Sequence, residues 1–225
     1  LLTAQWNKQT YTITYSANGG TGSASRTTDS YVYGSLAINL PTVGTLANTG
    51  YSFGGWSESN NGSALSGSYT PTQSRTLYAV WTANTYTISY NINGGSGTVP
   101  TSPVSYTTGA AGLTLPTVGD LAKTGYNFTG WATTANGTAL SGTGYTTTSN
   151  VTLYAIWTIK TINVTYSKGL ISSAEPTLTL FPTNTSGTYG SSITVSSSVD
   201  AFANTNSYAF AGWSDGTNTY AKGDS

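Results

Sequence analysis

YTITYSANGG at residues 11–20 returns as YTISYNINGG at residues 86–95, and this recurrence decides the architecture. Two further pairs of segments follow at the same spacing. They are LPTVGTLANTGYSFGGW (40–56) with LPTVGDLAKTGYNFTGW (115–131), and TLYAVW (76–81) with TLYAIW (152–157). Recurrence at a fixed period, here about 75 residues, is typical of tandem repeats in which every copy folds as a similar unit. Such arrays more often provide reach and spacing than chemistry.

Large apolar residues alternate with threonine at the start of each copy. Tyr11, Ile13 and Tyr15 fall on one face of an extended chain, with Thr12 and Thr14 between them. A period of two is typical of a half-buried β-strand. An Asn-Gly-Gly sequence follows in both copies and accepts the positive φ of a tight turn. Each copy is therefore predicted to open with a strand that runs into a turn.

The remainder of each copy predicts further short strands separated by turns. Pro41 cannot donate a ladder hydrogen bond, so a strand should stop there or lie at a sheet edge. Residues 45–48 are compatible with one helical turn, whereas residues 51–56 and 77–81 have the composition of strands. No segment has a sustained helical period. We expect four or five short strands around an aromatic core in each copy.

Four segments follow from the repeat. We predict the closing strand of a preceding repeat at residues 1–8, repeat 1 at 9–81, repeat 2 at 82–157, and a divergent repeat 3 at 158–225 that lacks its closing strand. The sequence Leu-Thr-Ala-Gln-Trp at 2–6 is the basis for the first segment. In repeat 3, Ser-Lys-Gly at 167–169 replaces the Asn-Gly-Gly turn, and the Gly-Trp motif returns at 207–213. The linker at 82–85 is short, which predicts a semi-rigid string.

The composition excludes several classes of function. Charged residues make up 6% of the chain, and 7 basic and 7 acidic residues leave no net charge. Nucleic acid is therefore not an expected partner, because no basic stripe is present to contact phosphates. No apolar run approaches the ~20 residues of a membrane span, so this segment is not expected to insert into a membrane. The 12% aromatic content at repeated positions argues against disorder.

Residues that could support catalysis or bind a metal do not form a pattern. Histidine and cysteine are absent, and neither the lysines nor the acidic residues recur between copies one and two. We therefore predict no enzymatic activity, no cofactor and no metal, and we assign no catalytic, cofactor-binding or metal-binding residue. Oxygen-rich loops at 58–62 and 215–218 resemble calcium loops, but the matching loop at 133–137 has no acid. Ordinary turns are the favoured interpretation.

The aromatic residues admit two interpretations. Tryptophans recur in two sets of three, at Trp56, Trp131 and Trp213 and at Trp6, Trp81 and Trp157. They could form a platform for sugar rings, but the core interpretation is favoured because small β-units depend on aromatic burial. Better candidates for an exposed platform are tyrosines that do not recur, such as Tyr31 and Tyr33, since copy two has only Tyr106 in the matching part. From the sequence, the ligand-binding residues are unknown.

Three motifs in fixed order resemble a known family. They are the opening strand with Asn-Gly-Gly, then Gly-Tyr-x-Phe-x-Gly-Trp, then Leu-Tyr-Ala-x-Trp, and the set resembles the Listeria–Bacteroides repeat, or internalin B-repeat. Copies one and two match all three motifs, whereas copy three has Ser207 in place of the first glycine and lacks the third motif. The resemblance implies compact β-grasp-like domains on bacterial surface proteins, with spacer or accessory adhesive roles and no conserved catalytic residues. Usual members are more charged than this chain.

Three functions are compatible with these observations. The leading hypothesis is a structural stalk of a large extracellular protein at the bacterial surface, whose partners are the neighbouring repeats. The alternative is an adhesive module for a glycan or protein on a host or neighbouring cell, with repeat 3 as the first suspect. A second alternative is a filament assembled head to tail by strand donation through residues 2–6, since open sheet edges pair with added strands.

Overall fold

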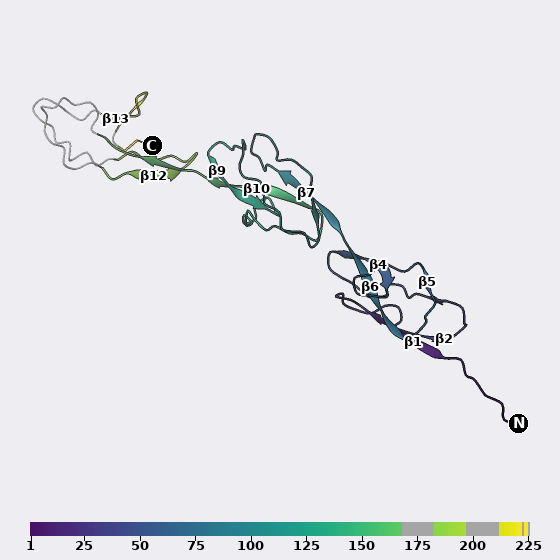
Figure 1. The fold of residues 1–225 in the computed structure, drawn as a ribbon. Helices are drawn as coiled ribbons and strands as arrows, with labels where there is room; N and C mark the ends of the chain where they lie inside the picture. The colour runs from purple at the N-terminus through teal and green to yellow at the C-terminus, as the bar shows by residue number, and fades with distance from the viewer. Residues whose placement is uncertain (168–181, 197–211, 222, 225) are drawn as a thin grey trace, which may run out of the picture. The chain divides into compact units, whose positions relative to one another are not determined.

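The computed structural model describes residues 1–167, 182–196, 212–221 and 223–224, and Figure 1 shows its ribbon. Every regular element in these residues is a β-strand, and none is a helix. The prediction of a mostly β chain built from tandem units of about 75 residues is confirmed, whereas the β-grasp-like detail stays a prediction. A turn replaces the single helical turn expected at 45–48, and it is closed by the Leu46 N–H, which donates to the Val43 carbonyl at 3.0 Å.

Repeat 1 forms a four-stranded sheet in the order β2-β1-β6-β4. Its strands are β1 (Thr10–Ser16), β2 (Thr28–Val32), β4 (Tyr51–Ser57) and β6 (Arg75–Ala83). β1 pairs antiparallel with β2 and parallel with β6, and β4 pairs antiparallel with β6. A second, two-stranded sheet joins β3 (Ile38–Asn39) to β5 (Ser68–Tyr69). The opening and closing segments of the repeat, which are far apart in sequence, therefore lie side by side at the centre of the sheet.

An aromatic and aliphatic core fills repeat 1. Ile13, Trp56 and Leu77 are almost completely buried and belong to one cluster, against which Phe53 and Trp81 pack. The Phe53 ring meets Trp56 and Trp81 edge-on, with ring centroids 5.3 and 5.8 Å away. The alternation of apolar residues with threonine in the opening strand predicts one buried face, and Ile13 on that face belongs to the core.

The Gly-Trp motif corresponds to a β-bulge. In repeat 1 the register between β4 and β6 shifts between Phe53 and Gly55, and Gly55 has a positive φ of 122°. Gly130 and Gly212, which precede the equivalent tryptophans, have φ values of 148° and 149°. L-residues with side chains rarely adopt this conformation, which explains why the motif contains glycine.

Asparagine side chains hold the Asn-Gly-Gly turns in place. Asn18 has a φ of 46°, and its Nδ2 donates to the carbonyls of Asn60 and Ala79 at 2.8 and 2.9 Å. In repeat 2, Asn93 has a φ of 50° and donates to the carbonyls at positions 135 and 155 at 2.7 and 2.9 Å. Asparagine both tolerates the left-handed conformation and supplies two donors that a glycine lacks.

Repeat 2 has the same strand pairs. Its four-stranded sheet has the order β8-β7-β10-β9, from β7 (Thr85–Asn91), β8 (Val104–Thr107), β9 (Tyr126–Ala132) and β10 (Val151–Ile159). β7 and β8 are antiparallel, as are β9 and β10. Trp157 faces Phe128 and Ile159 faces Tyr126, with a register shift between Ile156 and Trp157. This register positions the candidate site described below.

Adjacent strands at the first repeat boundary are separated by one residue. Residues 82–85 were expected to form a linker, but Thr82 and Ala83 belong to β6 and Thr85 to β7, which leaves only Asn84 between the two strands. The Asn84 N–H donates to the Gly50 carbonyl, and the Asn84 carbonyl accepts from the Thr108 N–H, both at 2.9 Å. The boundary residue is therefore held through both of its backbone polar groups.

The second boundary has the same pattern. Lys160 alone separates β10 from β11 (Thr161–Val164). Its N–H donates to the Gly125 carbonyl at 2.8 Å, and its carbonyl accepts from the Tyr189 N–H at 2.9 Å. Because the bonds are formed by the backbone, the pattern persists although asparagine is replaced by lysine.

The described part of repeat 3 keeps one aromatic contact of repeat 1. β11 pairs with β12 (Thr185–Thr188), and β13 (Trp213–Ser214) pairs with β14 (Thr219–Tyr220). The Tyr166 and Trp213 ring centroids are 4.6 Å apart at an interplanar angle of 58°, close to the 4.8 Å and 59° of Tyr15 and Trp56. The expected motif at 207–211 and the replaced turn at 168–169 lie outside the described residues.

Candidate binding hollow

Acidic residues in the two loops that resemble calcium loops are occupied by local hydrogen bonds. Glu58 accepts from the Tyr69 hydroxyl at 2.6 Å and forms an ion pair with Arg75. Asp215 accepts from the backbone N–H groups of Thr217 and Asn218, and these bonds hold the pKa of its carboxyl down to about 2. Across the described residues, no group of three or more acidic, histidine or cysteine side chains is placed to hold a metal ion.

The prediction of an exposed tyrosine platform is wrong for one of its two residues, because Tyr31 is buried. Tyr31 and Tyr106 are 4% and 5% exposed, and their hydroxyls donate to the Ser35 and Ala110 carbonyls. Each tyrosine sits opposite the first tyrosine of its repeat across an antiparallel pair, so the two are equivalent core residues. Their separation of 75 positions in the sequence was the overlooked signal. Tyr33 is exposed as expected, at 63%.

The two sets of tryptophans behave differently. Trp56 and Trp131 are buried, at 2% and 1% exposure, as the core interpretation predicts. Trp81 and Trp157 are only half-buried, and their Nε1 atoms donate to the carbonyls of Ala17 and Ile92 at 2.9 and 3.0 Å. Trp6 is exposed, in a segment without an assigned strand.

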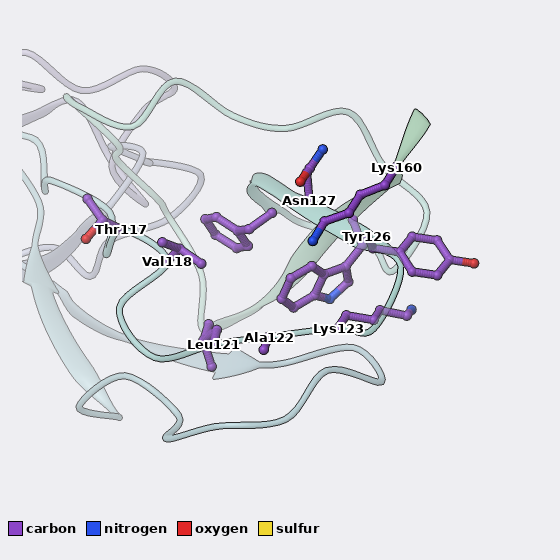
Figure 2. Close-up of a pocket in the computed structure, with 10 residues that line it drawn as sticks. Thr117, Val118, Leu121, Ala122, Lys123, Tyr126, Asn127 and Lys160 are labelled. Carbon is purple, nitrogen blue, oxygen red and sulfur yellow. The ribbon is translucent and has the colours of Figure 1, made fainter. Parts of the chain in front are cut away.

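A surface hollow of about 540 Å³ lies beside Trp157 on repeat 2. The loop before β9 forms one part of its wall, strand β9 a second part and the end of β10 a third (Figure 2). The lining residues are Thr117, Val118, Leu121, Ala122, Lys123, Tyr126, Asn127, Phe128, Trp157 and Lys160.

Three aromatic rings contribute to the wall of the hollow. Phe128 and Trp157 are in edge-to-face contact, with centroids 5.6 Å apart. The indole is fixed by its Nε1 hydrogen bond and by Gly95, where a Cβ would lie 2.6 Å from the Trp157 ring. Tyr126 is half-buried in the same strand as Phe128. The rings are thus held by the fold before any ligand binds.

Two lysines border the aromatic wall. The Lys123 Nζ lies 4.9 Å from the centre of the Tyr126 ring and donates to the Asn93 carbonyl at 3.3 Å. Lys160 is exposed, and in Figure 2 its side chain extends back over the hollow, on the side of Asn127 and opposite Lys123. The register between β9 and β10 produces this arrangement, because it brings position 160 beside Gly125.

The electrostatic character of the hollow is positive. Its lining includes two lysines and no acidic residue. Within the described ranges, neither lysine has a carboxylate at ion-pair distance. Asp120, next to the lining, is directed to Thr98, whose N–H and hydroxyl donate to it at 3.1 and 2.7 Å. These bonds lower the pKa of the Asp120 carboxyl, which therefore stays ionised.

Repeat 1 and the boundary residue that follows it are neutral at the equivalent positions. Asn48 corresponds to Lys123, Asn84 to Lys160 and Ser52 to Asn127. The Asn84 amide is part of a local network, accepting from the Ser52 hydroxyl at 2.6 Å and donating to the Tyr86 hydroxyl at 3.3 Å. Sequence reasoning used the absence of matching lysines to exclude a catalytic base and did not consider a binding site. The same difference between copies was the signal for this site.

Comparison with known proteins assigns the family. The sequence model of the Listeria–Bacteroides repeat domain matches residues 11–80 and 86–156, the two copies whose sheets are described above. The chain belongs to the Listeria–Bacteroides repeat family. The resemblance inferred from the three motifs is confirmed.

Relatives of this Listeria–Bacteroides repeat chain are much longer proteins. A protein of Evansella cellulosilytica described as "Putative membrane protein" is 31% identical over 215 residues, which are 94% of this chain and 30% of the relative. Internalin H of Listeria monocytogenes is 33% identical over 126 residues, which are 54% of this chain and 21% of that protein. The chain therefore spans less than a third of the length of each of these two relatives. Within the described residues, no helix has the length and apolar character needed to cross a bilayer.

Proposed function

We propose that this chain is a structural stalk region of a large extracellular protein on the bacterial surface. The supporting observation is the boundary between copies, where one residue separates two strands and both of its backbone polar groups are hydrogen-bonded. A stalk needs units that repeat a fold and joints that limit bending. The proposal assigns no catalysis and no cofactor to the repeats, and it makes neighbouring repeats the principal partners.

The relatives support the proposed location. Internalin H and the Evansella protein contain related sequence as a minor part of a longer chain, as expected for a repeat region that serves other parts of a protein. A neutral surface rich in threonine, serine and asparagine is also suited to the extracellular medium. Assembly by strand donation through residues 2–6, which have no assigned strand in the single chain, is the alternative that the mass measurement below addresses.

Distance distributions between spin labels on the first two repeats test whether the boundary at Asn84 limits bending. The chain has no cysteine, so T72C and T148C introduce the only thiols for spin labels, at exposed equivalent positions. We expect electron–electron resonance to give a narrow distribution. A matched control with a Gly-Gly-Ser-Gly insertion after Asn84 should broaden it, since such linkers are flexible. If the distance distribution is equally broad with and without the insertion, the proposed stalk function would be contradicted.

Small-angle scattering and light scattering complete the test. For residues 1–225, we expect an extended monomer, with the 23.2 kDa mass of the chain. A mass that rises with concentration, and that falls back when residues 1–6 are deleted, would instead support a filament joined through terminal strands. A compact monomer would argue against both the stalk and the filament.

A further inference from the structure

We propose that the hollow on repeat 2 binds an oligosaccharide that carries a carboxylate, as chains of uronic acids do. This inference goes beyond the stalk, because a spacer needs no ligand. The occupant is identified from three properties of the hollow: its charge, its aromatic wall, and its size with the neutral polar groups around it.

The charge of the hollow favours an anionic ligand. Lys123 and Lys160 border it from two sides, and its lining contains no acid. Because neither lysine has an ion-pair partner among the described residues, a ligand carboxylate would not have to displace a protein carboxylate. Hydrogen bonds between ammonium and carboxylate are roughly twice as strong as neutral ones, and here they would form beside apolar rings.

The aromatic wall favours a sugar ring. Tyr126, Phe128 and Trp157 present apolar surface that the bulge and the Trp157 hydrogen bond hold in position. One face of a sugar ring carries C–H groups that pack against such surface, while its hydroxyls stay at the rim. A preformed apolar wall with a few polar groups is the usual composition of a small-molecule site.

The size and the polar groups of the hollow fit a short oligosaccharide. Its volume of about 540 Å³ lies inside the range of roughly 300–1,000 Å³ typical of ligand sites. The Thr117 hydroxyl and the Asn127 amide supply neutral donors and acceptors of the kind that sugar hydroxyls need. An acidic peptide would use the lysines equally well but not the combination of an aromatic wall with these neutral groups.

The difference between repeats assigns this property to one copy. The aromatic residues of the hollow have identical counterparts in repeat 1, at Tyr51, Phe53 and Trp81, but asparagines occupy both lysine positions. We therefore expect repeat 2 to bind the anionic sugar and repeat 1 not to bind it. The natural asparagines also define substitutions that the scaffold accepts.

Titration of the ¹⁵N-labelled chain with uronic-acid oligosaccharides tests the proposal. The probes are a hyaluronan tetrasaccharide and a tetramer of galacturonic acid, followed by amide chemical shifts. We expect saturable shifts around Lys123, Asn127 and Lys160, with a dissociation constant of about 0.1–1 mM. Failure of both probes to give saturable shifts up to about 10 mM would overturn the proposal.

Matched ligands separate charge from sugar recognition. Chitotetraose retains the N-acetylglucosamine units of hyaluronan without a carboxylate, and polyglutamate of similar charge retains the carboxylates without a sugar. We expect both to bind at least about tenfold more weakly than the hyaluronan tetrasaccharide. Equal affinity for chitotetraose would contradict the role of the lysines, and equal affinity for polyglutamate would contradict the sugar.

Matched variants test the residues. K123N and K160N, which introduce the residues of repeat 1, should each weaken binding about tenfold, whereas K123R and K160R should retain it. K8N removes the same charge from the exposed segment before β1 and should change affinity less than about twofold. An equal loss in K8N and K123N would mean that only net charge matters, and would overturn the site.

Transfer of the lysines to repeat 1 gives the complementary test. The N48K/N84K variant should bind a second oligosaccharide per chain, with new shifts around Tyr51 and Trp81. A folded variant with unchanged stoichiometry would show that the two lysines are not sufficient and would contradict their assignment. The spin-label distances of the stalk experiment do not depend on these outcomes, so either proposal can fail alone.

Discussion

Repeat 1 pairs its charged side chains internally, whereas Lys123 of repeat 2 and the boundary residue Lys160 have no carboxylate partner among the described residues. In repeat 1, Arg26 binds Asp29 at 2.8 Å and Arg75 pairs with Glu58. In repeat 2, Lys123 contacts only a tyrosine ring and a backbone carbonyl in the described contacts. Two copies of one scaffold thus use charge differently, because repeat 1 forms ion pairs within itself whereas lysines border a surface hollow on repeat 2.

Hydroxyl partners follow the same division. The Tyr15 hydroxyl donates to Asp29 and the Tyr69 hydroxyl to Glu58, both at 2.6 Å. The counterparts of these acids in repeat 2 are Val104 and Thr133. The same sheet therefore forms with or without carboxylates, which implies that the aromatic core rather than the charges stabilises the scaffold.

The largest expected effect should be equal in both repeats. W56A and W131A each remove a fully buried indole and should lower the free energy of unfolding by about 3–5 kcal/mol. Native-state hydrogen exchange of peptides from each repeat locates the loss. W6A, at an 89% exposed position, is the control and should change little. If only one of the two variants loses unfolding free energy, the two cores are not energetically equivalent.

The turn asparagines should also behave alike. N18A and N93A each remove two side-chain hydrogen bonds and place alanine at a positive φ, so we expect a loss of about 2–3 kcal/mol. N18G and N93G remove the bonds but accept the backbone conformation, so their loss should be smaller by about 1 kcal/mol. Hydrogen exchange measures the loss of unfolding free energy. If the alanine and glycine variants lose equal amounts, the positive φ at positions 18 and 93 would carry no measurable cost for alanine.

An ionisable tyrosine should distinguish the repeats at high pH. Burial, together with the hydrogen bond to Glu58, raises the pKa of Tyr69 to about 12, above its ordinary value of 10. A raised folded-state pKa gives a stabilisation that is complete below pH 10 and is lost as the pH rises toward 12. At neutral pH, Y69F should cost about 1 kcal/mol, because a bond to a charged acceptor is lost.

Urea unfolding of wild type and Y69F between pH 8 and 11 checks this dependence. The advantage of wild type should shrink above about pH 10. Y145F in repeat 2 is the matched control and should cost less at neutral pH, since Thr133 replaces Glu58 there. If the difference in unfolding free energy between wild type and Y69F stays constant across this pH range, the raised pKa of Tyr69 would be contradicted.

The smallest expected effect concerns the lysines of the hollow. K123N removes a cation–π contact from a half-buried position and should lower stability by about 0.5 kcal/mol, with K8N near zero. Thermal unfolding of both variants measures the difference. A loss above about 2 kcal/mol in K123N would assign Lys123 a structural role and would remove it from the binding site.

Local sequence patterns predicted the strands but not the exposure of the tyrosines. The alternation at 11–15 and the Asn-Gly-Gly turns identify β1 and its turn, because side-chain period and positive φ are local properties. Tyr31 was wrongly expected to be exposed, and its equivalence to the buried Tyr106 was missed, because burial depends on the strand opposite. Each lies across from a tyrosine of the opening strand, which no local pattern reveals.

The sequence alone determined the repeat, the strand content, the family and the core role of Trp56 and Trp131, since all four follow from recurrence and from side-chain type. Only the tertiary structure decided that Lys123, Tyr126 and Lys160 border one hollow. The physical reason is the register between β9 and β10, which long-range backbone hydrogen bonds establish. It places position 160 beside position 125, and so turns two scattered lysines into one charged site.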